Sequence, residues 1–408
     1  MARVKLTTPN PRAEVRTVSS PDTTIEQVEF HNGRVVLKWC DGHESLFHPL
    51  WLRDNCMCSQ CGNRAVGQKL TYLMDLPEKP TPNALTLTSN GALHIRWAQG
   101  DHETTFAASW LREHCYSEAE RLRRRHQPIL WNHSLQDRLP QTTYEATFHD
   151  DRGHHELLSF IRDYGFALVH DVPTSQEGFA RMAGRIGYIR ETNYGKFSDL
   201  KVSPGPARTL SDTNHRIPLH TDECYRHANP GMLAFQCVSA SEDGAGATLL
   251  ADGFSVAEHV RNSDPEAFEL LCRVSVASRR FEHDNMDLRS QSPVISVDNE
   301  GRVQGVRYNE RSAAPLDIDE ALVEPTYAAL RCWLKACSDP GFRIGVVLQP
   351  GDFVVFDNQR VLHGRDTFGG GRHLYYCQLD LDEPHSRVRV LDRRLGLPAD
   401  NVTIHRGT

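Results

Sequence analysis

Apolar and polar residues alternate in two matching stretches near the N-terminus. Residues 33–39 are Gly-Arg-Val-Val-Leu-Lys-Trp and residues 91–97 are Gly-Ala-Leu-His-Ile-Arg-Trp. Each stretch leads into a polar turn with a glycine, then into a short run that ends in Trp-Leu-Arg-(Asp/Glu)-(Asn/His)-Cys. Alternation around a glycine-bearing turn is typical of a β-hairpin. The pattern therefore predicts a small β-rich domain of two similar hairpins over residues 20–120.

The pattern changes twice further along the chain. Residues 121–149 are rich in arginine, glutamine and proline, which is typical of a linker between domains. Residues 150–408 mix short strand-like runs with amphipathic stretches. Many short strands with few long helices favour a β-barrel or a double-sheet jelly roll decorated by helices. We therefore expect a mainly β protein with helices, in which residues 150–408 form the jelly roll.

Periodicity and glycine or proline stops predict the elements of this second domain. Helices are expected at residues 156–163 and 179–186, each followed by a glycine, within 254–277, and at 320–336 with a break at Pro325. The strand-like runs are residues 166–169, 232–238, 247–250, 303–308, 345–348, 353–356 and 374–379.

Composition narrows the possible partners. The net charge of -7 is unlike the basic domain that a nucleic-acid binder normally carries. No run approaches the roughly 18 apolar residues of a membrane span, and residues 1–10 show no apolar signal segment. We therefore expect a soluble, cytoplasmic protein that binds neither nucleic acid nor a membrane.

Three cysteines lie together on one short segment: Cys56, Cys58 and Cys61. A structural zinc site takes four tetrahedral ligands, usually cysteine or histidine. The fourth ligand must come from elsewhere, and the turns of the two hairpins offer His43 and His102 without a choice between them. An odd total of 11 cysteines, without a secretion signal, disfavours disulfides. We predict structural zinc, with an iron–sulfur cluster or a redox switch as the alternatives.

A second metal site is indicated by His220 and Asp222, in Leu-His-Thr-Asp. On an extended strand, residues two apart point to the same face, so an imidazole and a carboxylate can share one metal. Much later, an apolar strand leads to His363. Two histidines and one carboxylate form the facial triad of non-heme iron enzymes, which leaves coordination positions open. Another His-x-Asp element begins at His149 and is interpreted as a surface loop.

Arg372 follows His363 and opens another predicted strand. A guanidinium binds a carboxylate through two parallel hydrogen bonds, as a dicarboxylate cosubstrate requires. Taken singly, each residue has an alternative that is equally consistent with the sequence. His363 could be a hydrogen-bonded structural histidine, and Arg372 could form a surface ion pair. The ordered set of His220, Asp222, His363 and Arg372 favours a non-heme iron site beside a carboxylate-binding arginine.

These segments resemble the γ-butyrobetaine hydroxylase and trimethyllysine hydroxylase family, from about residue 30 to about residue 392. The motif His-Pro-Leu-Trp-Leu-Arg-Asp-Asn-Cys-Met-Cys-Ser-Gln-Cys at residues 48–61 is similar to the family's zinc motif, as is the turn at residues 101–103. On the catalytic side, the similar segments are residues 219–222, 252–254, 308–309, 356–358, 362–365 and 372–374.

The resemblance implies a double-stranded β-helix, Fe(II), the cosubstrates 2-oxoglutarate and O₂, structural Zn(II), and a homodimer. The implied reaction converts 2-oxoglutarate to succinate and CO₂ and hydroxylates an unactivated C–H bond of a small substrate. Arg372 would bind the distal carboxylate of 2-oxoglutarate with help from Thr248. The implied iron ligands are His220, Asp222 and His363, and the implied zinc ligands are Cys56, Cys58, Cys61 and His102.

The chain departs from the family where a trimethylammonium group is held by an aromatic cage. Tyr194 matches one cage position, but Ser198, Asp212 and Gln378 stand where the family has aromatic rings. Asp212 is either a charge partner for an ammonium group or a solvated loop residue. Asn309 resembles the family's contact for the acidic end of the substrate. The candidate substrates are therefore small zwitterions: a betaine, an amino acid or an aminophosphonate analogue.

Two other functions compete with the oxygenase. One is a cupin-like isomerase or hydrolase that uses another metal in the same site. The other is a non-catalytic interaction protein organised by zinc. Dependence on 2-oxoglutarate distinguishes the oxygenase from the first, and iron binding distinguishes it from the second.

Overall fold

The structure is a computed structural model that describes residues 23–201, 213–282 and 285–397. It divides into two compact units, Met1–His126 and Gln127–Thr408. The division falls inside the segment expected to be a linker, residues 121–149. Trp131, from the later part of that segment, packs in the core of the second unit. Among the helices in the described part of the chain, none combines the length and the apolar character of a membrane span.

The first unit contains the two expected hairpins, each followed by a short helix. Gly33 at φ 74° and Gly91 at φ 76° make tight turns in a conformation that favours glycine. Apolar side chains of both repeats, Trp39 and Trp97 among them, form one shared core. The elements are β1 (Ile25–His31), β2 (Arg34–Trp39), β3 (Glu44–Phe47), α1 (Pro49–Asp54), β4 (Gly62–Asn63), β5 (Gln68–Lys69), η1 (Leu73–Asp75), β6 (Pro82–Leu87), β7 (Leu93–Trp97), β8 (Glu103–Phe106), α2 (Ala108–Glu113) and α3 (Glu118–Arg124).

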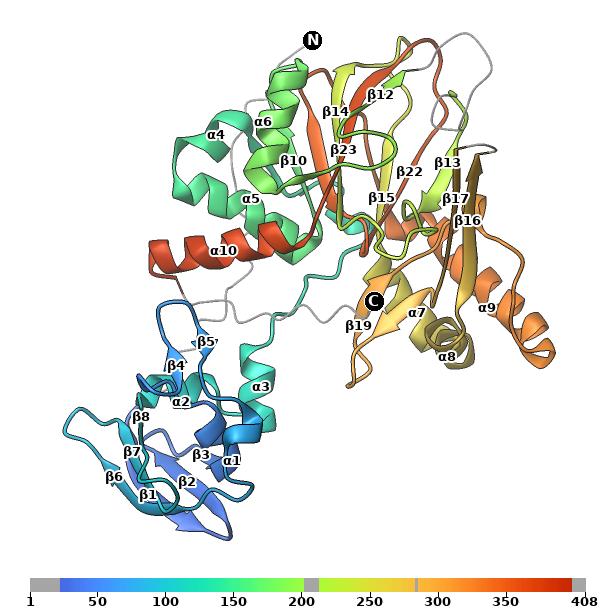
Figure 1. The fold of residues 1–408 in the computed structure, drawn as a ribbon. Helices are drawn as coiled ribbons and strands as arrows, with labels where there is room; N and C mark the ends of the chain where they lie inside the picture. The colour runs from blue at the N-terminus through green and yellow to red at the C-terminus, as the bar shows by residue number, and fades with distance from the viewer. Residues whose placement is uncertain (1–22, 202–212, 283–284, 398–408) are drawn as a thin grey trace. The chain divides into compact units, whose positions relative to one another are not determined.

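Two facing sheets form the second unit (Figure 1). The larger has the order β11-β23-β14-β21-β10-β9, with β12 also paired to β23, and the smaller has the order β13-β22-β15-β20. Apolar side chains such as Phe356 and Leu250 fill the space between them. The strands are β9 (Gln141–Thr143), β10 (Phe166–His170), β11 (Ile189–Arg190), β12 (Ser198–Lys201), β13 (Ile217–His220), β14 (Met232–Ser239), β15 (Thr248–Asp252), β20 (Arg343–Val346), β21 (Phe353–Asp357), β22 (Val361–Arg365) and β23 (His373–Leu379).

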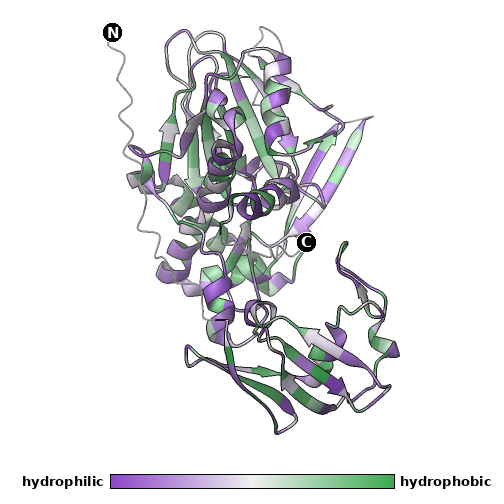
Figure 2. Ribbon diagram, turned by 90° about the vertical axis from the view of Figure 1, so that its left-hand side faces the viewer, coloured by the Kyte–Doolittle hydropathy of each residue, from purple (hydrophilic) through white to green (hydrophobic). Residues whose placement is uncertain are grey.

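Helices cover the outer face of the larger sheet, where apolar residues of α5, α6 and α10 pack on its strands (Figure 1). Figure 2 shows hydrophobic residues concentrated in the strands and hydrophilic residues on these helices. The helices are α4 (Tyr144–His149), α5 (Asp151–Tyr164), α6 (Gln176–Ile186) and α10 (Asp382–Leu395).

A further layer packs beside the smaller sheet, where α7, α8 and α9 share a core with a two-stranded hairpin. A second hairpin, β16–β17, follows α8 in the chain. The elements are α7 (Gly253–Ser263), α8 (Pro265–Arg273), β16 (Val276–Glu282), β17 (Met286–Ser292), β18 (Ile295–Val297), β19 (Val303–Val306) and α9 (Glu320–Ser338), with the short turns η2 (His133–Leu135), η4 (Glu310–Ser312) and η5 (Pro340–Phe342).

The fold class predicted from the sequence is confirmed, but two helices differ from expectation. The predicted break at Pro325 is wrong, because α9 runs through that residue. Pro325 lies near the start of the helix, where its missing N–H removes one bond and the remaining turns continue. The amphipathic stretch 254–277 is two helices, since Asp264 caps the second one and Pro265 opens it.

A buried ion pair joins the smaller sheet to the loop before β22. The Arg360 guanidinium donates to both carboxylate oxygens of Asp252 at 3.0 and 3.1 Å, and the Asp252 side chain has no exposed surface. Asp252 also accepts from the backbone N–H of Trp131 at 3.1 Å. Asp252 lies opposite Val361 in the β15–β22 pairing, so the pair holds the register of these strands.

Replacing Asp252 by asparagine keeps the volume but leaves Arg360 as an uncompensated buried charge. We expect the free energy of unfolding to fall by about 3–5 kcal/mol, measured by urea denaturation. The matched control is Asp287→Asn, which breaks a solvated pair with Arg279 at 2.8 Å and should change stability little. Equal losses in the two variants would contradict this role for the buried pair.

Candidate active site and metal centres

Two adjacent strands bring the predicted iron ligands together. His220 ends β13 and lies directly opposite His363 of β22 in the antiparallel pairing. Asp222 follows two residues later, with its carboxylate 3.1 Å from His220 Nε2 and 3.8 Å from His363 Nε2. One ligand atom from each residue lies within 4.8 Å of the others. The three side chains therefore converge on one point.

The surroundings of the three side chains suit a divalent metal. His220 Nδ1 lies 2.8 Å from the Pro218 carbonyl oxygen, which can only accept, so Nδ1 carries the proton and Nε2 keeps its lone pair. The Asn358 side chain accepts from the Asp222 backbone N–H at 2.7 Å and donates to the Asp222 carbonyl at 3.1 Å. Contacts of this kind fix the orientation of metal ligands.

The charge states also fit a metal. Burial lowers the pKa of His363 to about 3, with a contribution from His220, so the imidazole is neutral near pH 7. Burial acts to raise the pKa of Asp222, but His363, His220 and Arg311 outweigh it and the net shift is downward. A carboxylate and two neutral imidazoles are the donors of a facial iron triad.

Arg372 is buried rather than a surface residue. Its guanidinium donates to the Gly246 carbonyl at 2.9 Å and to the Thr248 hydroxyl at 3.3 Å. Within the described residues it forms no salt bridge with a carboxylate. Burial lowers the pKa of Arg372, although the group stays charged near neutral pH. A buried cation of this kind needs an anionic partner.

The residues predicted to contact substrate are only partly gathered around the triad. Gln378 is buried and donates to the Tyr376 hydroxyl at 3.0 Å, and that hydroxyl lies 3.4 Å from Asp222 Oδ2. Ser198 lies opposite Tyr376 in the β12–β23 pairing. Tyr194 is 37% exposed, in the loop between β11 and β12.

Asn309 is buried, and its side-chain oxygen accepts from the backbone N–H of Arg311 at 3.1 Å. Asp212 lies outside the described residues.

Sequence reasoning missed two residues that reach the triad. Arg311 places a guanidinium nitrogen 2.7 Å from His220 Nε2, and Tyr376 lies beside Asp222. The signal for Tyr376 was present, because it stands two residues before Gln378 and so shares its strand face. The signal for Arg311 was weaker, because its position depends on the 3₁₀ turn that begins after Asn309.

The first unit holds the second cluster of ligands. His102 Nε2 lies 3.4, 3.9 and 3.6 Å from the sulfur atoms of Cys56, Cys58 and Cys61. A tetrahedral zinc with Zn–S of about 2.3 Å and Zn–N of about 2.0 Å sets these atoms about 3.5 Å apart. Burial lowers the pKa of His102, which favours the neutral imidazole that a metal needs. The donors fit zinc, and His43 is not among them.

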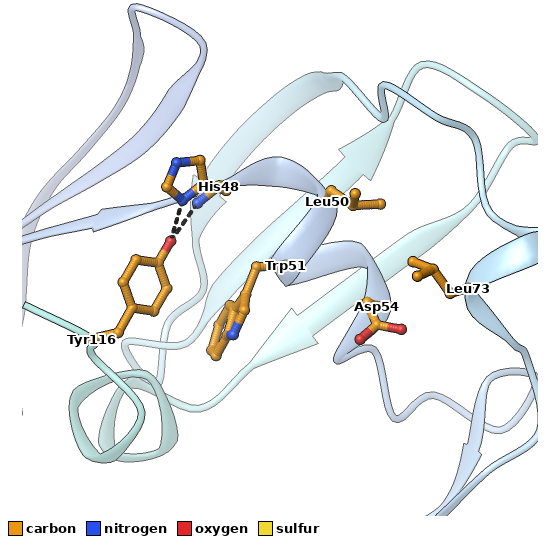
Figure 3. Close-up of a pocket in the computed structure, with 6 residues that line it drawn as sticks. All are labelled: His48, Leu50, Trp51, Asp54, Leu73 and Tyr116. Atoms are coloured by element: carbon orange, nitrogen blue, oxygen red, sulfur yellow. Dashed lines mark hydrogen bonds between the residues drawn. The ribbon is translucent and has the colours of Figure 1, made fainter. Parts of the chain in front are cut away.

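A hollow on the first unit is of a different kind (Figure 3). It is lined by His48, Leu50, Trp51, Asp54, Leu73 and Tyr116. The Tyr116 hydroxyl meets the backbone N–H of His48 at 2.8 Å and its ring Nδ1 at 2.7 Å. These two groups satisfy each other and the remaining walls are mostly apolar, so the hollow does not resemble a catalytic site.

The fold and the triad together define a class, the metal-dependent dioxygenases with a jelly-roll core. The sequence model of the "Taurine catabolism dioxygenase TauD, TfdA family" matches residues 143–378. The chain belongs to this dioxygenase family. A second model, "Gamma-butyrobetaine hydroxylase-like, N-terminal", matches residues 27–112, the hairpin repeats of the first unit.

Relatives match over almost the whole chain. A gamma-butyrobetaine dioxygenase of Pseudomonas sp. (strain AK-1) is 35% identical, over 94% of this chain and 100% of its own. A trimethyllysine dioxygenase of Meyerozyma guilliermondii is 28% identical, over 91% of this chain and 96% of its own. The human gamma-butyrobetaine dioxygenase is 27% identical, over 91% and 98%. The resemblance expected from the motifs is therefore confirmed.

Asn358 gives a test of the triad that does not depend on turnover. Asn358→Ala removes both bonds to the Asp222 backbone, and we expect Co(II) or Fe(II) affinity to fall about 10- to 100-fold. Metal titration of protein whose Cys₃His site is already filled with Zn(II), followed by absorbance, measures the change at the triad. The control is the neighbouring Gln359→Ala, whose amide meets Asn229 instead. Unchanged metal affinity in a folded Asn358→Ala variant would contradict the role of Asn358 in positioning Asp222.

Proposed function

We propose that this dioxygenase holds Fe(II) with His220, Asp222 and His363 and hydroxylates a small betaine-like zwitterion. The observation that carries the proposal is the meeting of His220 at the end of β13, His363 on β22 and the Asp222 carboxylate two residues after β13. When bound, iron and 2-oxoglutarate supply the oxidising chemistry, in which O₂ delivers one oxygen atom to succinate and one to the product while CO₂ leaves. The protein binds, orients and shields the reactants.

Arg372 and Thr248 are proposed to bind the distal carboxylate of 2-oxoglutarate. The guanidinium is buried, is already oriented by Gly246 and Thr248, and has no carboxylate partner among the described residues. Two parallel N–H donors match a carboxylate in geometry as well as charge. This arrangement selects a dicarboxylic oxoacid.

Arg311 is proposed to bind the acidic end of the substrate. Its guanidinium reaches the triad, although the residue as a whole is exposed. Arg280 lies near enough to contribute to the lowered pKa of Arg311, whose main cause is burial of the guanidinium. Arg280 is itself paired with Glu282 at 2.9 Å, so Arg311 is the cation that reaches the triad, and a carboxylate or phosphonate fits beside it. The cationic end of the substrate would face Tyr194, Ser198 and Gln378, with Asp212 as a further charge partner.

The first experiment follows succinate by NMR with Fe(II), ascorbate and 2-oxoglutarate. The panel holds γ-butyrobetaine, trimethyllysine, glycine betaine, simple amino acids, and aminoethylphosphonate with its N-methylated forms. We expect one compound to stimulate succinate and gain a hydroxyl. His220→Ala should abolish both signals, whereas His227→Ala, at an exposed histidine, should not. Substrate conversion without 2-oxoglutarate would favour the isomerase or hydrolase instead.

A pair of variants separates the two anion sites. Loss of a charge-assisted hydrogen bond costs about 1.5–3 kcal/mol, so Arg311→Met should raise the KM for the substrate about 10- to 100-fold. Arg372→Met should raise the KM for 2-oxoglutarate instead. Each variant serves as the control for the other. If Arg311→Met changes only the 2-oxoglutarate KM, the guanidinium binds the cosubstrate and the assignment is wrong.

Zinc in the first unit is proposed to be structural, because four protein donors leave no open position. A homodimer in the cytoplasm, free of nucleic acid and membrane, also remains a proposal. Exposed apolar side chains near η1, with Met74 at 92% exposure, form a surface that suits a second copy. Analytical ultracentrifugation measures the oligomeric state.

A further inference from the structure

The first unit contains a second site that repeats the zinc site with other residues. The two hairpin–helix repeats place His43 and Cys115 at the positions of His102 and Cys56. The imidazole–sulfur distance is 3.5 Å between His43 and Cys115 and 3.4 Å between His102 and Cys56. In each site the histidine comes from one repeat and the cysteine from the other. The two sites therefore correspond to each other when the first repeat is interchanged with the second.

The hydrogen bonds around the two cysteines match as well. The Ser45 hydroxyl donates to Cys115 at 3.1 Å, and the Thr104 hydroxyl donates to Cys56 at 3.2 Å. In both repeats a tryptophan indole donates to that hydroxyl at 2.9 Å. The backbone N–H of each cysteine donates to the carbonyl of the arginine three residues earlier at 3.3 Å. The correspondence therefore includes the shell that orients the donors.

The two remaining donors differ between the sites. Cys58 lies two residues after Cys56, and the same step after Cys115 reaches Ser117, whose hydroxyl oxygen is 3.4 Å from the Cys115 sulfur. Cys61 lies five residues after Cys56, and the same step after Cys115 reaches Glu120. Within the described residues, no group of three metal donors forms around His43.

In both sites an arginine contacts the residue that lies five positions after the first cysteine, which is Cys61 in one site and Glu120 in the other. Arg53 donates to the Cys61 sulfur at 3.2 Å, and its counterpart Arg112 donates to the Glu120 carboxylate at 2.9 Å. The Glu120 side chain is only 5% exposed, and Arg123 also reaches it at 2.8 Å. In the second site, guanidinium nitrogen atoms therefore surround the Glu120 carboxylate. In the zinc site, the corresponding place is occupied by thiolates that would surround a metal.

We propose that the first unit is built from two copies of one metal-binding framework, and that in the second copy an arginine–glutamate network replaces the metal. A metal cation joins anionic donors from two segments, and buried guanidinium groups do the same for a buried carboxylate. Arg112 also pairs with Asp41 at 2.9 Å, so the network ties the first hairpin to α3. The inference requires zinc in the first site but is independent of the catalytic reaction.

The test restores the two missing thiols in the full chain. Ser117→Cys combined with Glu120→Cys should create a Cys₃His site, and the thiolate-to-cobalt charge-transfer band on Co(II) loading should double relative to wild type. The iron triad contains no cysteine, so it does not contribute to this band. A folded variant with the wild-type band would overturn the proposal, as would a wild-type protein that already binds two cysteine-ligated ions.

A reciprocal exchange keeps the proposal testable if that variant does not fold. Cys58→Ser with Cys61→Glu should lose the cobalt band but keep the first unit folded, because Arg53 gains a carboxylate partner. The matched control, Cys58→Ser with Cys61→Ser, loses the metal without gaining an ion pair. We expect a lower Tm for the control by circular dichroism. Equal Tm values for the two variants would overturn the proposal.

Discussion

The triad depends on the buried contact between Asp252 and Arg360. This pair lies at the end of β15 and immediately before β22, and it fixes which residues of the two strands face each other. The register of these strands decides which side chains face the metal site, because a slip by one residue turns each side chain to the opposite face. In the observed register Leu250 lies opposite His363, and His363 in turn lies opposite His220 on β13. The ion pair thus lies at the start of the β15–β22 pairing that places His363.

Much of the fold and of the metal ligands follows from local patterns. Alternating apolar and polar residues predict the hairpins. The close spacing of the three cysteines, and of His220 and Asp222, identifies most of the metal donors. The parts that sequence reasoning missed depend on long-range placement. The choice between His43 and His102 requires knowing that the hairpins exchange partners, and the approach of Arg311 to His220 requires the path of the turn after β19. Pro325 shows that a local rule fails where one lost bond is outweighed by the following turns.

The two metal centres differ in how many donors the protein supplies. The cluster in the first unit has four, which fill a tetrahedron and leave no place for a reactant. The cluster at β13 and β22 has three, and the Arg311 guanidinium reaches it where an anion can bind. Open coordination positions beside fixed positive charges are what oxidative chemistry on charged small molecules requires. Donor count thus distinguishes a structural centre from a catalytic one.

The zinc site of the first unit takes its donors from both repeats, and this has a consequence for when the site can form during synthesis of the chain. Cys56, Cys58 and Cys61 leave the ribosome well before His102, the residue that completes their coordination sphere. Three thiols alone hold a metal less firmly and remain open to exchange or oxidation. A closed four-donor site requires the second hairpin to pack against the first, because only then does His102 meet the three thiols. The four donors are therefore complete only when both repeats are present and packed together.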